Sequence, residues 1–93
     1  MTAYAIVTLT ITDPEQFDRY RAQAGAALEK HQITTLQVSK SPQKLEGIAE
    51  VPQLIVLLSA TNAEDFHAWH NDPDFAEVHE MRRSSGNVSL MLL

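Results

Sequence analysis

The order of local patterns along this chain predicts an α+β fold of the ferredoxin-like type, a split βαβ arrangement with both helices on one face of an antiparallel sheet. Four short runs of β-type residues alternate with two segments of helical periodicity in the order strand, helix, strand, strand, helix, strand. Apolar residues make up 44% of the 93 residues and charged residues 20%, which is typical of one small globular domain. We therefore expect a single domain over residues 1–93.

The first strand and the first helix are marked by their junction. Residues 3–12 are rich in β-branched side chains and stop at Asp13-Pro14, which predicts a strand. The carboxylate of Asp13 can cap a helix, with Pro14 at its first position and Gln16 completing a capping box. Up to an expected helix end near Lys30, a buried stripe follows at spacings of three and four: Phe17, Tyr20, Ala24, Ala27, Leu28 and His31.

The second half begins with a hairpin and continues with an interrupted helix. Residues 33–40 and 52–60 are β-type runs with turn residues between them, which predicts two strands joined by a long loop. Thr61 with Glu64 three residues later predicts the capping box of the second helix.

A break divides this second helix. Asn71-Asp72-Pro73 interrupts it because proline breaks the hydrogen-bond ladder, and the Asp-Pro pair should cap a further helical segment at once. Gly86 marks the end of that segment, and residues 87–93 form the last strand.

Both faces of the predicted sheet carry apolar residues. Every second residue of a strand lies on the same face of the sheet. In the first strand one face carries Ala5, Val7, Leu9 and Ile11, and the other carries Tyr4, Ile6, Thr8 and Thr10. In the third strand one face carries Leu54, Val56 and Leu58, and the other carries Ile55 and Leu57. Helices can cover only one face. At ~25 cal/mol per Å² of buried apolar surface, leaving the second face in water would cost several kcal/mol of stability. We therefore expect a homodimer with its sheets face to face about a two-fold axis.

Composition excludes several partners and sites. Cysteine is absent, so disulfides, thiolate zinc sites and thiol nucleophiles are excluded. A net charge of −5 has the wrong sign for binding nucleic acid. The longest apolar run, Leu54 to Leu58, is far shorter than the ~20 residues of a membrane-spanning helix, and the first residues lack a signal-peptide pattern. We expect a cytoplasmic protein with no nucleic-acid partner, no membrane contact and no cofactor.

Four elements of the sequence resemble a known family: Asp13-Pro14-Glu15-x-Phe17-x-x-Tyr20, Leu45-Glu46-Gly47, Trp69-x-x-Asp72-Pro73-x-Phe75, and Arg82. Over nearly the whole chain the pattern is similar to the DUF1330 family, a domain of unknown function in the dimeric α/β-barrel superfamily. The resemblance implies the same fold and a dimer, and no settled activity; relatives by fold include cofactor-free oxygenases, haem-degrading oxygenases and lactone isomerases. The family usually has glycines where this chain has His31-Gln32-Ile33, and an aromatic, usually Tyr, at His70.

Histidines on the second helix are candidate functional groups. With Phe66 at the centre of the buried face and 100° per residue, Trp69 lies about 60° to one side, His70 about 40° to the other and His67 about 100° away. His70 should therefore point inward, either as a buried imidazole bonded to a carbonyl or as a general acid/base. His67 and His70 diverge by about 60°, which disfavours a shared metal, and we expect no metal site.

An arginine is predicted to face the core of the last helical segment. Relative to Phe75, Arg82 lies about 20° from the centre of the buried face and His79 about 40°. A guanidinium aimed at the core needs a partner, so Arg82 should pair with Glu46 or Glu80, meet the carbonyls at a helix end, pass the core with its charge in solvent, or meet an anionic ligand. His79 has the same two interpretations as His70.

Two classes of function remain open. The first is a small enzyme, oxygenase-like or isomerase-like, on an apolar or aromatic molecule, in which His70 moves a proton and Arg82 holds an enolate or carboxylate. Further groups shape its pocket: Tyr4 on the face assigned to the dimer, Tyr20, Trp69 and His79. The alternative is a non-catalytic module that binds a small ligand or only dimerises, with the same residues as core and ion pairs; a haem-handling protein is a more distant third.

Overall fold

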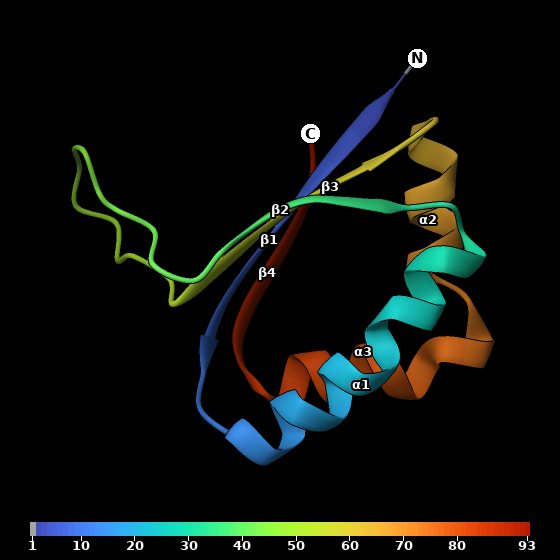
Figure 1. Cartoon of the computed structure of the whole chain (residues 1–93), viewed down its shortest axis with the longest axis horizontal. Coiled ribbons are helices and arrows are strands. Elements are labelled where there is room, and N and C mark those ends of the chain that lie inside the picture. Colours follow the sequence, from blue (N-terminus) through green and yellow to red (C-terminus); the bar gives the residue numbers. More distant parts are fainter. Residues whose placement is uncertain (1) are drawn as a thin grey trace.

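The computed structural model describes residues 2–93, which form one sheet and one layer of helices (Figure 1). In chain order the elements are β1 (Ala3–Ile11), α1 (Pro14–Lys30), β2 (Thr34–Ser39), β3 (Leu54–Ala60), α2 (Ala63–His70), the 3-10 turn η1 (Pro73–Phe75), α3 (Ala76–Ser84) and β4 (Gly86–Leu92). This order confirms the predicted ferredoxin-like α+β fold. Within residues 2–93, no helix is long and apolar enough to cross a bilayer.

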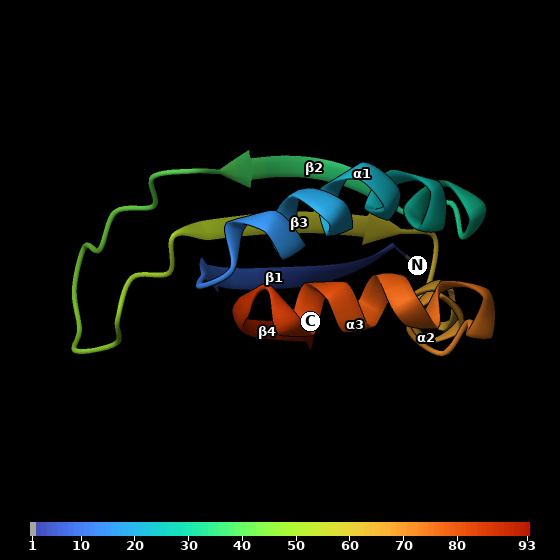
Figure 2. The ribbon, with the colours of Figure 1, turned by 90° about the horizontal axis from the view of Figure 1, so that it is seen from below.

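The four strands form an antiparallel sheet in the order β2-β3-β1-β4, and the helices lie on one of its faces (Figure 2). The other face has no cover within residues 2–93. A single chain thus builds an open sheet and not a closed barrel, so the barrel named in the predicted architecture is not present in one chain.

Side-chain caps start α1 and α2, and one predicted cap lies at a different residue. The Asp13 carboxylate accepts from the amide of Gln16, as expected, but the Gln16 side chain donates to Ser84 on α3 instead of closing a capping box. At α2 the cap is Asn62, which accepts from the amide of Asp65, so the predicted Thr61 capping box is wrong by one residue. Asn is an equally good cap, which is why the sequence pattern admitted both.

Residues from both layers form the core. It consists of Ala5 and Val7 on β1, Leu58 and Ala60 on β3, Ala27 on α1, Ile33, and Phe66 and Trp69 on α2. The alternation predicted for β1 is confirmed, because Ala5, Val7 and Leu9 are buried beneath the helices while Tyr4 is 42% exposed on the open face.

Gly86 has a different role from the predicted helix stop. It is the first residue of β4 and pairs with Ile11, and α3 ends without a left-handed glycine. A Cβ at this position would lie 2.0 Å from the carbonyl oxygen of Thr10. Gly86 is therefore required by the close approach of β4 to β1.

The turn that follows α1 uses a residue in the left-handed region. Gln32 has φ of 57°. Its amide donates to the Glu29 carbonyl and the amide of Ile33 donates to the Leu28 carbonyl, the bonding pattern of a Schellman motif. Glycine is the usual residue at this position because a Cβ is strained there.

Gln32→Gly should therefore stabilise the protein by about 1 kcal/mol, since it removes the left-handed strain and keeps both main-chain hydrogen bonds. Urea unfolding at fixed protein concentration measures this. Gln37→Gly, in the strand β2, serves as the control and should destabilise. An unchanged or lower stability of Gln32→Gly would contradict a strained turn.

Candidate functional site

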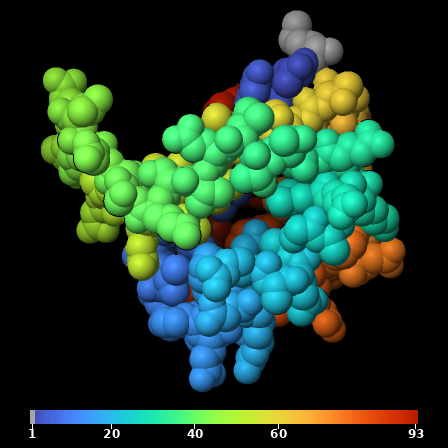
Figure 3. Space-filling view, in the orientation of Figure 1, coloured from blue at the N-terminus to red at the C-terminus, as the bar shows by residue number. Residues whose placement is uncertain are grey.

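A cavity of about 210 Å³ lies between α1 and the sheet. Figure 3 shows a hollow between the green strand β2 and the blue helix α1. Most of its lining is apolar, and the residues are Val7, Leu9, Phe17, Tyr20, Arg21, Ala24, Leu28, Thr35, Val38, Leu54, Val56, Leu58, Trp69 and Arg82. An apolar cavity with few polar groups is the usual form of a small-molecule site.

The polar group most deeply placed in this lining is Arg82, whose residue surface is only 2% exposed. The guanidinium lies close to two aromatic rings, with its central carbon 5.9 Å from the centre of Tyr20 and 5.3 Å from that of Trp69. Both distances are in the range of cation–π attraction. The inward orientation predicted for Arg82 is thus confirmed.

The carboxylate partner predicted for Arg82 is not found. Glu80 pairs with Arg83 at 3.2 Å, and Glu46 is exposed in loop 40–53. Among residues 2–93 the one hydrogen bond of the Arg82 side chain joins its Nη1 to Nδ1 of His79 at 2.7 Å, and its buried Nε has no partner. Burying a cation without an anion costs folding free energy. Arg82 is therefore one half of an ion pair whose negative group is missing.

His79 is neutral, and its tautomer follows from its two contacts. Because a guanidinium only donates, Nδ1 of His79 must accept from Arg82, and Nε2 must carry the proton that it donates to the Trp69 carbonyl at 2.8 Å. Burial lowers the pKa of His79, the Trp69 carbonyl raises it, and the charge of Arg82 lowers it further. The net shift is downward, which agrees with a neutral ring.

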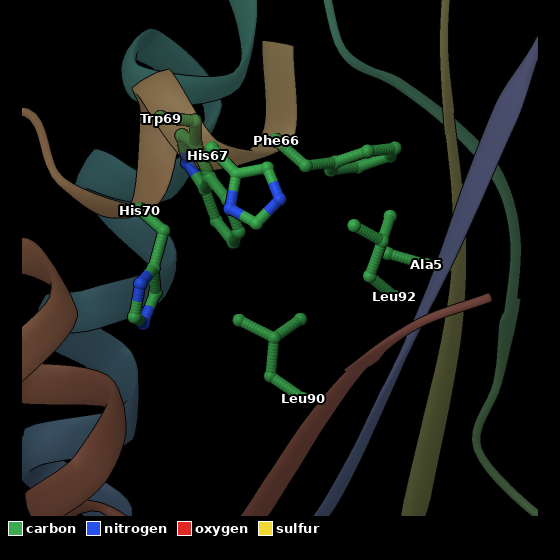
Figure 4. Close-up of a pocket in the computed structure, with 7 residues that line it drawn as sticks. All are labelled: Ala5, Phe66, His67, Trp69, His70, Leu90 and Leu92. Carbon is green, nitrogen blue, oxygen red and sulfur yellow. The ribbon is translucent and has the colours of Figure 1, made fainter. Parts of the chain in front are cut away.

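A second, shallower pocket of about 190 Å³ lies on the other side of Trp69 (Figure 4). Its lining combines α2 with β1 and β4, and consists of Ala5, Phe66, His67, Trp69, His70, Leu90 and Leu92. His70 is exposed, so the prediction that it points into the core is wrong, and His67 lines the same pocket. Both histidines are exposed residues of this lining. Partial burial and the nearby charge of Arg82 lower the pKa of His70.

The structure brings four of the six predicted site residues together. Arg82 contacts Tyr20, Trp69 and His79 directly. His70 reaches this group only through His79, with ring centres 5.7 Å apart, and it lines the other pocket. Tyr4 lies on the open face, opposite the helices, and lines neither pocket.

Sequence reasoning missed a cluster of charges that holds α1 to the start of η1. The buried carboxylate of Asp72 accepts from Lys30 at 2.8 Å and from His31 at 2.7 Å, and it caps η1 by accepting from the amide of Asp74. The helical spacing places His31 on the buried stripe of the first helix but gives it no partner. The charge pattern alone could not pair residues about forty positions apart, although the Asp-Pro cap was visible.

Asp72→Asn should lower the melting temperature at pH 7 and flatten its acid dependence. Hydrogen bonds from Lys30, then from His31, hold the pKa of Asp72 far below its ordinary 3.8. The folded pKa is depressed, so this stabilisation is present above about pH 3.8 and is lost as pH falls through the folded pKa. Thermal melts between pH 7 and 2 test this, with the exposed Asp74→Asn as control. Parallel curves for Asp72→Asn and the unmodified protein would contradict it.

Comparisons with known proteins agree with this architecture. The family model described as "Domain of unknown function (DUF1330)" matches residues 2–93. No curated protein matches the chain.

Three solved structures share the fold at low sequence identity. A protein of unknown function from Rhodopseudomonas palustris has a TM-score of 0.84 and 13% identity, covering 99% of this chain and 80% of that one. SnoaB, a cofactor-independent oxygenase from Streptomyces nogalater, has a TM-score of 0.69 and 12% identity, covering 99% and 90%. A dimeric ferredoxin-like protein of unknown function from Jannaschia sp. CCS1 has a TM-score of 0.65 and 18% identity, covering 100% and 98%. At these identities the likeness concerns the fold alone.

Proposed function

Since the chain belongs to the DUF1330 family of unknown function, its activity must be argued from its own site, and we propose that it binds a small, mainly apolar or aromatic molecule carrying an anionic group in the cavity beneath α1. The apolar body of the ligand would contact side chains such as Phe17, Val38 and Leu54. Its anionic group would meet Arg82.

One observation carries this proposal: Arg82 is buried in an apolar cavity, and no carboxylate among residues 2–93 pairs with it. A buried arginine that served only structure would be expected to pair with Asp or Glu, because the desolvation of its charge is otherwise not offset. A ligand anion would supply the missing charge and leave the aromatic contacts of Tyr20 and Trp69 in place.

Native mass spectrometry of the purified protein, followed by titration with 2-naphthoate, tests the proposal. A co-purified organic acid, or saturable binding of 2-naphthoate that quenches the single tryptophan, Trp69, would support it. A bare protein that binds neither 2-naphthoate nor smaller aromatic acids such as benzoate would contradict it. Arg83→Gln is the control, because Arg83 lies on the same helix but is 50% exposed and pairs with Glu80.

Catalysis is the second candidate, favoured by the position of Arg82 in the cavity. Loss of a proton beside a carbonyl gives an enolate, and a guanidinium stabilises the charge that develops on its oxygen. This is the isomerase-like or oxygenase-like reading, in which His70 would act as base. His70 lines the neighbouring pocket and not this cavity, which is why we place binding first. Deuterium incorporation into a bound ketone or acid, lost in both His70→Gln and Arg82→Gln, would reverse that order.

We also propose a homodimer that covers the open face of the sheet. The dimeric ferredoxin-like protein from Jannaschia shows that a chain of this fold can pair. Loop 40–53 bends toward the side opposite the helices in Figure 1, and its Leu45 and Ile48 are fully exposed. A second copy seated on the open face would cover apolar surface on the strands and on this loop.

The cytoplasmic location expected from the sequence stays a prediction.

A further inference from the structure

The unpaired donors of the Arg82 guanidinium restrict the chemical class of ligand that it can bind. A guanidinium presents two pairs of parallel donors, one at its end and one at its side, and the side pair consists of Nε and Nη2. Nη1 is engaged by His79, whereas Nε is buried and has no hydrogen-bond partner among residues 2–93. Nη2 also has no hydrogen-bond partner among residues 2–93, so the side edge is the pair on which both donors are unpaired, and this pair matches two oxygens of one planar group.

Three side chains hold this guanidinium in place. Its central carbon lies within 6 Å of the ring centres of Tyr20 and Trp69, and His79 accepts from its Nη1. His79 is itself fixed, because its ring meets the indole of Trp69 edge-on at 4.8 Å and its Nε2 donates to the Trp69 carbonyl. The guanidinium is thus oriented before any ligand arrives, which lowers the entropic cost of binding.

We infer that the ligand is a carboxylic acid whose carboxylate is bound side-on by Nε and Nη2 of Arg82, and that neutral His79 is the residue that positions this edge. The inference rests on the proposed function and adds the class of ligand and a positioning residue. A carboxylate supplies two parallel acceptors and the missing negative charge. A hydroxyl or an amide supplies at most one acceptor and no charge.

Protonation of His79 would release the guanidinium. Nδ1 would then carry a proton toward Nη1 of Arg82, so that two donors and two positive charges would face each other. Among the described residues, the other charged or titratable groups around His79 are His70 on α2 and Arg83 on α3, with Tyr20 of α1 beyond Arg82; none is a carboxylate that would favour the imidazolium. Carboxylate affinity should therefore fall as pH falls through the folded pKa of His79.

Paired probes separate the inference from the proposed function. We would measure binding of 2-naphthoate and of its neutral isostere 2-naphthamide by calorimetry between pH 5 and 8, where the carboxylate of the probe stays ionised. In the unmodified protein 2-naphthoate should bind at least tenfold more tightly than 2-naphthamide at pH 8, and the preference should shrink toward pH 5. The Nε–H resonance of Arg82 should shift with 2-naphthoate and not with 2-naphthamide.

Two variants of His79 test its role. His79→Asn places an amide oxygen near the position of Nδ1, where it can accept from Arg82 but cannot titrate, so the carboxylate preference should persist without the pH dependence. His79→Leu removes the acceptor and should reduce the preference at least tenfold at pH 8. If the leucine variant fails to fold, the asparagine variant and the pH profile of the unmodified protein still decide the matter. Arg83→Gln should behave as the unmodified protein.

The outcomes that overturn the inference are distinct from those that overturn the proposed function. Equal affinity for both probes, or an unmoved Arg82 Nε–H resonance, would refute the side-on carboxylate while leaving ligand binding intact. The same pH profile in His79→Asn would refute the positioning role of His79. Failure of both probes to bind at any pH would contradict the proposed function itself.

Discussion

Replacing Arg82 by Met is expected to raise the stability of the unliganded protein and to abolish its affinity for an aromatic carboxylate. Methionine has a similar length and is apolar, so it can fill the space between Tyr20 and Trp69 without a buried charge. The variant leaves Nδ1 of His79 without a donor, at a cost of about 1 kcal/mol, but removes an unpaired cation whose desolvation costs more. We expect a net gain of about 1–3 kcal/mol.

Thermal melting at fixed protein concentration, together with the 2-naphthoate titration, measures both halves of this expectation. The melting temperature should rise by about 5 °C or more, since 1 kcal/mol corresponds to roughly 4–8 °C in a domain of this size. Carboxylate affinity should fall at least a hundredfold, because the charge-assisted pair is lost. Arg83→Met, at an exposed site, should leave both the melting temperature and the affinity for 2-naphthoate nearly unchanged. A marked loss of stability in Arg82→Met would show that the arginine serves the fold.

The opposite signs of these two effects are what distinguish a binding site from a structural contact. Selection keeps a destabilising group only where function needs it, so stability gained on its removal marks a site. In contrast, Asp72 is buried, pairs with the charge of Lys30 and accepts a hydrogen bond from His31, so its removal should only destabilise. Two buried charged residues ten positions apart are therefore expected to differ in sign: replacing Arg82 should raise the stability and replacing Asp72 should lower it. The reason is that Asp72 has a cationic partner whereas Arg82 has no anionic one among residues 2–93.

Local patterns predicted the order and nature of every strand and helix, because capping residues and periodicity act over three to eight residues. Asp13-Pro14 and Asp72-Pro73 cap helices where expected. The errors lie where two residues of similar chemistry are adjacent, as with Thr61 and Asn62, or where the cause is a distant strand, as with Gly86 against Thr10. A pattern read over a few neighbouring residues cannot show which distant strand a residue will contact.

The candidate site was predictable in its residues and not in its contacts. Helical geometry placed Arg82 inward, and Arg82 is buried on α3 together with Val78 and His79. Its pairing with His79 came from the i, i+3 spacing on that same helix, yet only the tertiary position of the Trp69 carbonyl fixes the tautomer that lets His79 accept. His70 failed the same projection: it is the last residue of α2 and is exposed, although Trp69 before it is buried.

The open face of the sheet carries an apolar row whose members come from three strands. The strand register aligns Met91 of β4 with Ile6 of β1 and Ile6 with Leu57 of β3. Met91 is 53% exposed and the other two are half-buried, although this face has no cover within residues 2–93. A row that crosses the centre of the sheet would lie near the two-fold axis of a face-to-face dimer, where each side chain is used twice.

Ile6→Glu should therefore raise the dissociation constant of the proposed homodimer at least a thousandfold, equivalent to about 4 kcal/mol. The substitution removes an apolar contact from each subunit and buries two like charges close to each other. Sedimentation velocity at micromolar concentration should show a dimer for the unmodified protein and a monomer for Ile6→Glu, with Ala26→Glu on the exposed surface of α1 remaining dimeric. A dimeric Ile6→Glu would place the interface elsewhere, and a monomeric unmodified protein would refute the dimer. Because the Arg82 cavity opens on the helix side of the sheet, an Ile6→Glu monomer that still binds 2-naphthoate would show that each subunit carries a complete site.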